Sequence, residues 1–168
     1  MLRNVFLIAL ALAAVAGPAR AGETVLIHLT DDFKKNDGPV CVAFNVAWQA
    51  LEDGDTVEIF FDQDAAYGLK QWEPGKTDLG LYPLPDRIKE LLAETFGVGV
   101  DTLPENYQVY LERLHERGVR ITVNGFWNAL TQVEKTVTGK ENILPIVEPI
   151  TLKQFLADRA AADVYLRF

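Results

Sequence analysis

Cys41 is the only cysteine of the chain and the residue best suited to covalent chemistry. It follows Pro39 by two residues, and proline is typical of the first turn of a helix. Backbone N–H groups and the helix dipole at that point favour an anion, which predicts a thiol with a lowered pKa. A thiolate there can attack a disulfide, accept a persulfide sulfur or bind a soft metal. The alternative is a small buried hydrophobic residue between Val40 and Val42.

Acidic residues follow the first two strands that the sequence predicts. Asp31 and Asp32 come after one run of apolar and β-branched residues, and Asp62 and Asp64 come after the next. In a parallel sheet the four carboxylates would gather at one edge, where oxygen ligands can hold a cation. Acids after strands more often form turns and cap helices. The sequence therefore leaves a cation site as the weaker of the two explanations.

His28 lies in the first of these strands, where its side chain alternates with Leu26 and Thr30. Its imidazole can add a nitrogen ligand or a hydrogen bond at the same edge. A lone histidine in a strand is more often a hydrogen-bonded core residue.

Asn124 follows the third predicted strand and precedes Gly125. An asparagine side chain hydrogen-bonds well but is no nucleophile for sulfur chemistry, and an Asn-Gly pair is common in plain turns. Trp127, close behind, can line a pocket or a subunit interface together with Trp72, Tyr67 and Tyr82. We expect His28, Asp31, Asp62, Asn124 and Trp127 to line one binding pocket.

Composition excludes several classes of protein. With 49% hydrophobic and 24% charged residues, the 168-residue chain has the composition of one globular domain. A net charge of −8 repels nucleic acid, and one cysteine with two histidines cannot build a disulfide framework or a structural zinc site. The sequence has no P-loop, no GxSxG or HExxH motif and no dinucleotide fingerprint, so we expect no cofactor and no bound metal.

The first 21 residues have the pattern of a secretory signal peptide. Arg3 precedes an apolar run from Val5 to Ala16, and the small-residue ending Ala19-Arg20-Ala21 predicts cleavage near Ala21. The apolar run is short for a membrane span and no stop-transfer pattern follows, so we expect no stable membrane anchor. We expect a periplasmic or otherwise exported protein with a single domain over 22–168. In an oxidising compartment its lone thiol must be buried, used or paired with another chain.

Strands and helices alternate along the rest of the chain. This order predicts a three-layer α/β/α sandwich around a mostly parallel sheet of about five strands. We expect strands over 24–29, 56–61, 119–123 and 164–168, with an irregular edge strand within 143–149, and helices over 39–51, 88–96, 104–116, 126–137 and 152–161, the last capped by Thr151. Residues 68–86, rich in glycine and proline, form a long irregular excursion.

Three segments, VLIHLTD, AFNVAWQALEDGDTVEIFFDQDAAY and ITLKQFLADRAAADVYLRF, resemble the DsrE/DsrF-like family of sulfur-relay proteins. The resemblance spans most of the chain after the signal peptide and implies a homo-oligomer, a trimer or a multiple of one. Some members of the family pass a persulfide sulfur between cysteines. In those members the resemblance puts the cysteine just after the strand corresponding to 118–123, where this chain has Asn124.

These observations leave three hypotheses for function, and a classical enzyme is not the favoured one. The first is an exported DsrE-like protein of sulfur or thiol metabolism, with Cys41 as a thiol or persulfide carrier that meets a thiol partner protein. The second is a non-enzymatic oligomeric module of the same fold that binds a ligand or partner. The third and weakest is an exported cation-binding protein that uses the acidic strand ends.

Overall fold

The computed structural model describes residues 22–168, so the predicted signal peptide lies outside the described residues. The centre of the molecule is a sheet in which every strand runs parallel to its neighbours. Its strand order is β6-β5-β2-β1-β7. The bounds are β1 (Thr24–Leu29), β2 (Thr56–Phe61), β5 (Arg120–Asn124), β6 (Glu148–Ile150) and β7 (Val164–Arg167). The predicted α/β sandwich with a parallel five-stranded sheet is therefore confirmed.

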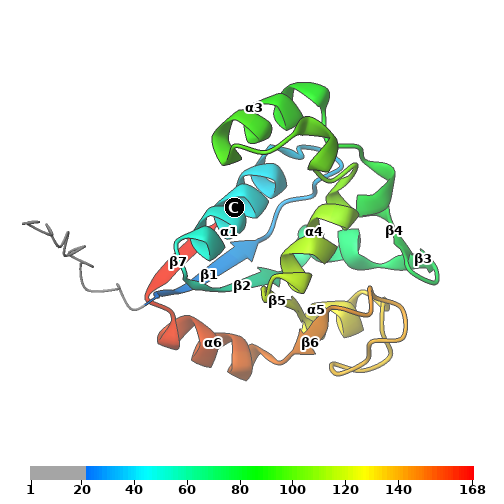
Figure 1. Ribbon diagram of the computed structural model, residues 1–168. Helices are drawn as coiled ribbons and strands as arrows, with labels where there is room; N and C mark the ends of the chain where they lie inside the picture. Colours follow the sequence, from blue (N-terminus) through cyan, green and yellow to red (C-terminus); the bar gives the residue numbers. More distant parts are fainter. Residues whose placement is uncertain (1–21) are drawn as a thin grey trace, which may run out of the picture.

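One face of the sheet carries the main hydrophobic core. Side chains that alternate along the central strands, such as Ile27 and Ile59, are fully buried on this face. They pack against α1 (Gly38–Glu52) and α4 (Tyr107–Glu116), which cover this side of the sheet (Figure 1). The helix α3 (Asp86–Phe96) lies outermost, beyond α1 (Figure 1).

The opposite face is more polar and has a thinner cover. Among the described residues, α6 (Leu152–Ala161) and its flanking residues pack on a small cluster there, which includes Leu26 and Phe60. The Arg120 guanidinium fixes α6 in place, since it lies 3.0 Å from Asp158 of the helix and 2.9 Å from Glu58 of the sheet. As predicted, the Thr151 side chain caps the helix.

The region after β5 differs from the prediction. The helix expected over 126–137 is only α5 (Gly125–Leu130), and the chain then runs irregularly to β6. Gln132 adopts a positive φ of 60°, which breaks the helix, and the Glu134 side chain turns inward to accept a hydrogen bond from the backbone of Asn142. Burial of Glu134 thus outweighs the helical periodicity of the sequence.

The excursion predicted over 68–86 lies outside the central sheet, but it is less irregular than expected, because it contains short helical turns and an unpredicted hairpin. Short elements follow β2 in the order α2 (Gln63–Ala66), η1 (Tyr67–Leu69), β3 (Gln71–Glu73), β4 (Lys76–Thr77) and η2 (Asp78–Leu81), and η3 (Val100–Thr102) follows α3. The strands β3 and β4 pair antiparallel around the turn at Gly75. None of the helices within residues 22–168 is long and apolar enough to cross a membrane.

Candidate functional site

Four polar side chains meet near the carboxyl ends of the central strands, and we call this group the Asp62 corner. It comprises His28 at the end of β1, Asp62 directly after β2, Asn124 at the end of β5 and Tyr165 of the neighbouring strand β7. The carboxyl ends of parallel strands are the usual place for ligands in α/β proteins. The structure thus brings together three of the residues predicted to share a pocket and adds Tyr165.

Asp62 is the acceptor at the centre of the corner. Its Oδ1 accepts hydrogen bonds from Asn124 Nδ2 and from the Gln63 backbone, both at 2.8 Å, and its Oδ2 lies 3.3 Å from His28 Nε2. Burial alone raises the pKa of Asp62, but the hydrogen bonds from His28, Asn124 and Gln63 outweigh it and hold the pKa below its usual value. Asp62 is therefore ionised at neutral pH.

The backbone directly after Asp62 is strained. Gln63 has a φ of 48°, a left-handed conformation that non-glycine residues rarely adopt. Such strain gathers at functional sites, where the surrounding structure enforces it. Here it turns the Gln63 N–H back toward the Asp62 carboxylate.

His28 links Asp62 to Tyr165. Its Nδ1 lies 2.6 Å from the Tyr165 hydroxyl, and its ring lies 5.1 Å from the rings of Phe60 and Phe155. With Asp62 ionised, the hydrogen-bond network assigns the proton to Nε2, which donates to Asp62, while Nδ1 accepts from the Tyr165 hydroxyl. The result is a phenol–imidazole–carboxylate chain across three strands.

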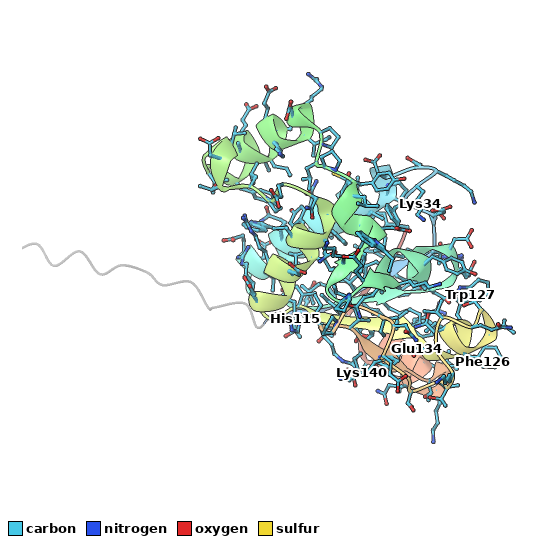
Figure 2. All side chains as sticks on the ribbon, turned by 90° about the vertical axis from the view of Figure 1, so that its right-hand side faces the viewer. Lys34, His115, Phe126, Trp127, Glu134 and Lys140 are labelled. Carbon is cyan, nitrogen blue, oxygen red and sulfur yellow. The ribbon has the colours of Figure 1, made fainter. Side chains whose placement is uncertain are left out.

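Asn124 has two structural tasks. Its Nδ2 donates to Asp62, and its Oδ1 accepts from the Trp127 backbone at 3.1 Å, so the side chain also caps α5. Trp127 reaches the corner through this cap and its ring meets Tyr67 edge to face, with centroids 6.5 Å apart. Figure 2 shows Trp127 and Phe126 on α5, on the other side of the view from His115 at the end of α4. Asn124 therefore orders the corner and the helix together.

Asp31 does not join the other predicted pocket residues. It is exposed just beyond β1, and within residues 22–168 its side chain contacts Thr30 Oγ1 at 3.4 Å and none of the corner residues. Trp72 and Tyr82 also lie elsewhere, since Trp72 is on the exposed hairpin and Tyr82 packs on Phe33. The aromatic cluster expected around Trp127 is reduced to its contact with Tyr67.

Cys41 is separated from the corner by the sheet. It belongs to the first turn of α1 and is buried in the core on the face of the sheet opposite to His28, with only 6% of the residue exposed. Burial raises the pKa of its thiol more than hydrogen bonds from Tyr107 and Asn45 lower it, so the expectation of a lowered pKa is wrong. The dipole of α1 is outweighed because Cys41 lies in a desolvated site.

The acids at the strand ends do not gather into one cluster. Asp62 contacts His28 and Asn124 in the Asp62 corner. Asp32 and Asp64 instead share Lys35, whose Nζ lies 3.4 and 3.7 Å from their carboxylates. Within residues 22–168 no three His, Cys, Asp or Glu side chains are placed to hold a metal ion. This arrangement matches the turn-forming role of these acids.

Comparison with solved structures identifies the fold. The chain has the fold of the ychN protein from E. coli. The crystal structure of that protein aligns with a TM-score of 0.55 and 16% sequence identity, over 88% of this chain and 100% of the other. No family model matches the sequence, and a comparison with curated proteins gives no match either.

Proposed function

We propose that this protein is an exported, non-enzymatic member of the DsrE/DsrF-like family that serves sulfur or thiol metabolism by binding a partner at the Asp62 corner. The sequence segments that resemble the family, the shared fold with ychN and the signal-peptide pattern support the proposal. The fold itself carries no information about chemistry, so the argument for binding comes from the site.

The observation that carries the proposal is the position of the thiol. At the place where the resemblance implies a sulfur-carrying cysteine, the chain has Asn124, and both ends of that amide are occupied by Asp62 and Trp127. Cys41 is buried behind the sheet with a raised pKa, which disfavours the thiolate needed for sulfur transfer. Binding without a covalent sulfur step therefore fits the geometry better than a Cys41 carrier.

The corner suits a ligand group that donates hydrogen bonds. Asp62 is ionised and its side chain is 14% exposed, while the hydrogen bonds from Asn124 and Gln63 both use Oδ1. Its Oδ2, held only by the long contact to His28, has lone-pair capacity for an ammonium, guanidinium or amide N–H group. The half-buried Tyr165 belongs to the same group of side chains, because its hydroxyl contacts His28.

Reaction with polysulfide tests whether Cys41 carries sulfur. The chain 22–168 is incubated with sodium polysulfide, and its intact mass is measured without denaturant. We expect no added sulfur on the folded protein. The matched control is Cys41→Ala with Val42→Cys, which moves the thiol by one residue to a position that is 50% exposed and should gain sulfur rapidly. Equal uptake by the native chain and the control would restore the carrier hypothesis.

A titration tests the Asp62 corner itself. Methylguanidinium chloride is added to the labelled protein and amide shifts are followed by NMR, with sodium chloride at equal ionic strength as the reference. We expect shifts centred on Gln63 and Asn124 that disappear in Asp62→Asn. Shifts spread over all surface acids, or unchanged in the variant, would show that the corner is no binding site.

We propose further that the protein is a homo-oligomer that buries the outer sides of α5 and α6. α6 has no buried residue, and its Leu152 and Leu156, four residues apart, are both exposed. Phe126 and Leu130 are exposed in the same spacing on α5, and Phe126 lies at the margin of the molecule (Figure 2). Two exposed apolar pairs at helical spacing are typical of association surfaces.

A further inference from the structure

The helix α3 does not bury its own apolar stripe. Ile88, Leu91, Leu92 and Phe96 recur at the spacing of one helix face, as in helices that pack on a core. Only Leu92 among them is buried, and Leu91 is 47% exposed. The backbone of α3 has more close neighbours in the adjacent η3 turn than in α1. The apolar face of the helix is therefore incompletely covered.

A groove runs between this face of α3 and the outer side of α1. Its volume is about 360 Å³, and Val42 and Val46 of α1 line it opposite Leu91 and Phe96 of α3. Its polar lining residues are the uncharged side chains of Asn45, Gln49 and Thr95. Among the described residues, no charged side chain lines the groove, although the chain has 24 acidic and 16 basic residues.

We propose that this groove binds an uncharged, mainly apolar small molecule. The volume falls within the range of about 300–1,000 Å³ that is usual for small-molecule sites, and a mostly apolar lining with a few polar groups is typical of them. A charged ligand would lose water here without gaining an ion partner, which disfavours it strongly. The match between a neutral lining and a neutral ligand thus determines the class of occupant.

The side-chain amide of Asn45 is a polar group of the groove that can bind a ligand. Asn45 Oδ1 accepts a hydrogen bond from the Tyr110 hydroxyl at 3.0 Å, and its Nδ2 lies 3.7 Å from Cys41 Sγ. The amide is thereby fixed in orientation, and within residues 22–168 one N–H of Nδ2 has no hydrogen-bond partner. This N–H suits a carbonyl or ether oxygen on an otherwise apolar molecule.

The groove is independent of the Asp62 corner. Its helices lie on the face of the sheet opposite to His28, so the two sites can be tested separately. A nearby reporter exists, because the Trp48 ring lies 5.4 Å from the ring of the lining residue Phe96. Filling the groove should change the emission of Trp48.

The test uses the neutral dye N-phenyl-1-naphthylamine as the probe. Dye fluorescence and total tryptophan emission, to which Trp48 contributes with Trp72 and Trp127, are followed while the dye is added to the chain 22–168, to Val42→Glu and to Val100→Glu. The two valines are 50% and 44% exposed, but only Val42 lines the groove. We expect Val42→Glu to weaken dye binding by about tenfold or more, because the dye would bury the new charge, and Val100→Glu to leave it nearly unchanged.

Other outcomes would overturn the proposal. Equal weakening by both variants, or no saturable binding to the native chain, would mean that the groove is no small-molecule site. A native oligomer that dissociates in Val42→Glu, measured by light scattering, would identify a second copy of the chain as the occupant. A negatively charged naphthalene sulfonate dye that binds as tightly as the neutral one would refute the argument from the uncharged lining.

Discussion

Replacing Asn124 with aspartate tests directly whether its amide organises the corner. The side chain is buried, and its Nδ2 donates to Asp62 Oδ1 at 2.8 Å. Asn124→Asp keeps the size of the side chain and the capping oxygen for Trp127, but replaces the donor with a second carboxylate. The only large changes are thus one lost hydrogen bond and one added charge.

The expected loss of stability follows from these two changes. A hydrogen bond to a charged acceptor contributes about 1.5–3 kcal/mol. Two carboxylates about 4 Å apart repel by about 4 kcal/mol at an effective dielectric constant of about 20, although protonation of one of them limits this cost. We therefore expect the free energy of unfolding at pH 7 to fall by about 3–4 kcal/mol.

The loss must depend on pH with a defined sign. In Asn124→Asp the carboxyl pair has one pKa raised above its unfolded value, so the folded state binds more protons and gains stability as the pH falls toward about 4. In the native protein the pKa of Asp62 is lowered, so its contribution is present above the unfolded pKa and is lost as the pH falls through the folded one. The stabilities of the two proteins therefore converge on acidification.

Urea unfolding followed by tryptophan fluorescence at pH 7 and pH 5 measures the effect. The control is the exchange Asp62→Asn with Asn124→Asp, which restores one amide and one carboxylate and should recover at least half of the loss. A loss below about 1 kcal/mol at pH 7, less than a single hydrogen bond to a charge, would refute the reasoning. So would a loss that is equal at both pH values and is not recovered by the exchange.

Three further predictions concern α6, the association surface and export. Arg120→Met leaves Glu58 and Asp158 without their cation and should lower the free energy of unfolding by about 2 kcal/mol. The loss is smaller than for a fully buried pair because Arg120 is partly exposed. Hydrogen exchange of the α6 amides should become faster. Leu156→Lys should lower the molar mass measured by light scattering to that of a monomer while the circular dichroism spectrum stays unchanged. Amino-terminal sequencing of the protein from the exported fraction should begin at Gly22, whereas a start at Met1 would contradict the predicted cleavage.

Elements with local signals were predicted well from the sequence. The strand β1 and the Thr151 cap of α6 depend on residue type and spacing within a few positions, and both appear where expected. The failure after Leu130 has a cause outside the helical pattern, because the backbone turns at Gln132 and Glu134 is then buried and bonded to Asn142. The helical spacing of apolar residues over a few turns does not indicate such a contact.

The candidate site was predicted in part for the same reason. His28, Asp62 and Asn124 were placed at one edge because each ends a parallel strand, and that argument needs only the fold class. Tyr165 was missed because its contact with His28 joins residues 137 positions apart and depends on β7 pairing with β1. For Cys41, helix position alone predicted the wrong direction of the pKa shift, since burial of the thiol dominates.

The pairing of β1 with β7 has a consequence for the time at which the protein folds. Thr24, at the start of β1, is hydrogen-bonded to Asp163, 139 residues further along, and β1 lies between β2 and β7 in the sheet. Until β7 arrives, one edge of β1 has no strand beside it, and pairing over so long a separation is slow to form. In a chain exported as proposed, the sheet would be completed only after the carboxyl-terminal strand β7 has crossed the membrane. Compactness and resistance to proteases would then be acquired only on the far side of the membrane.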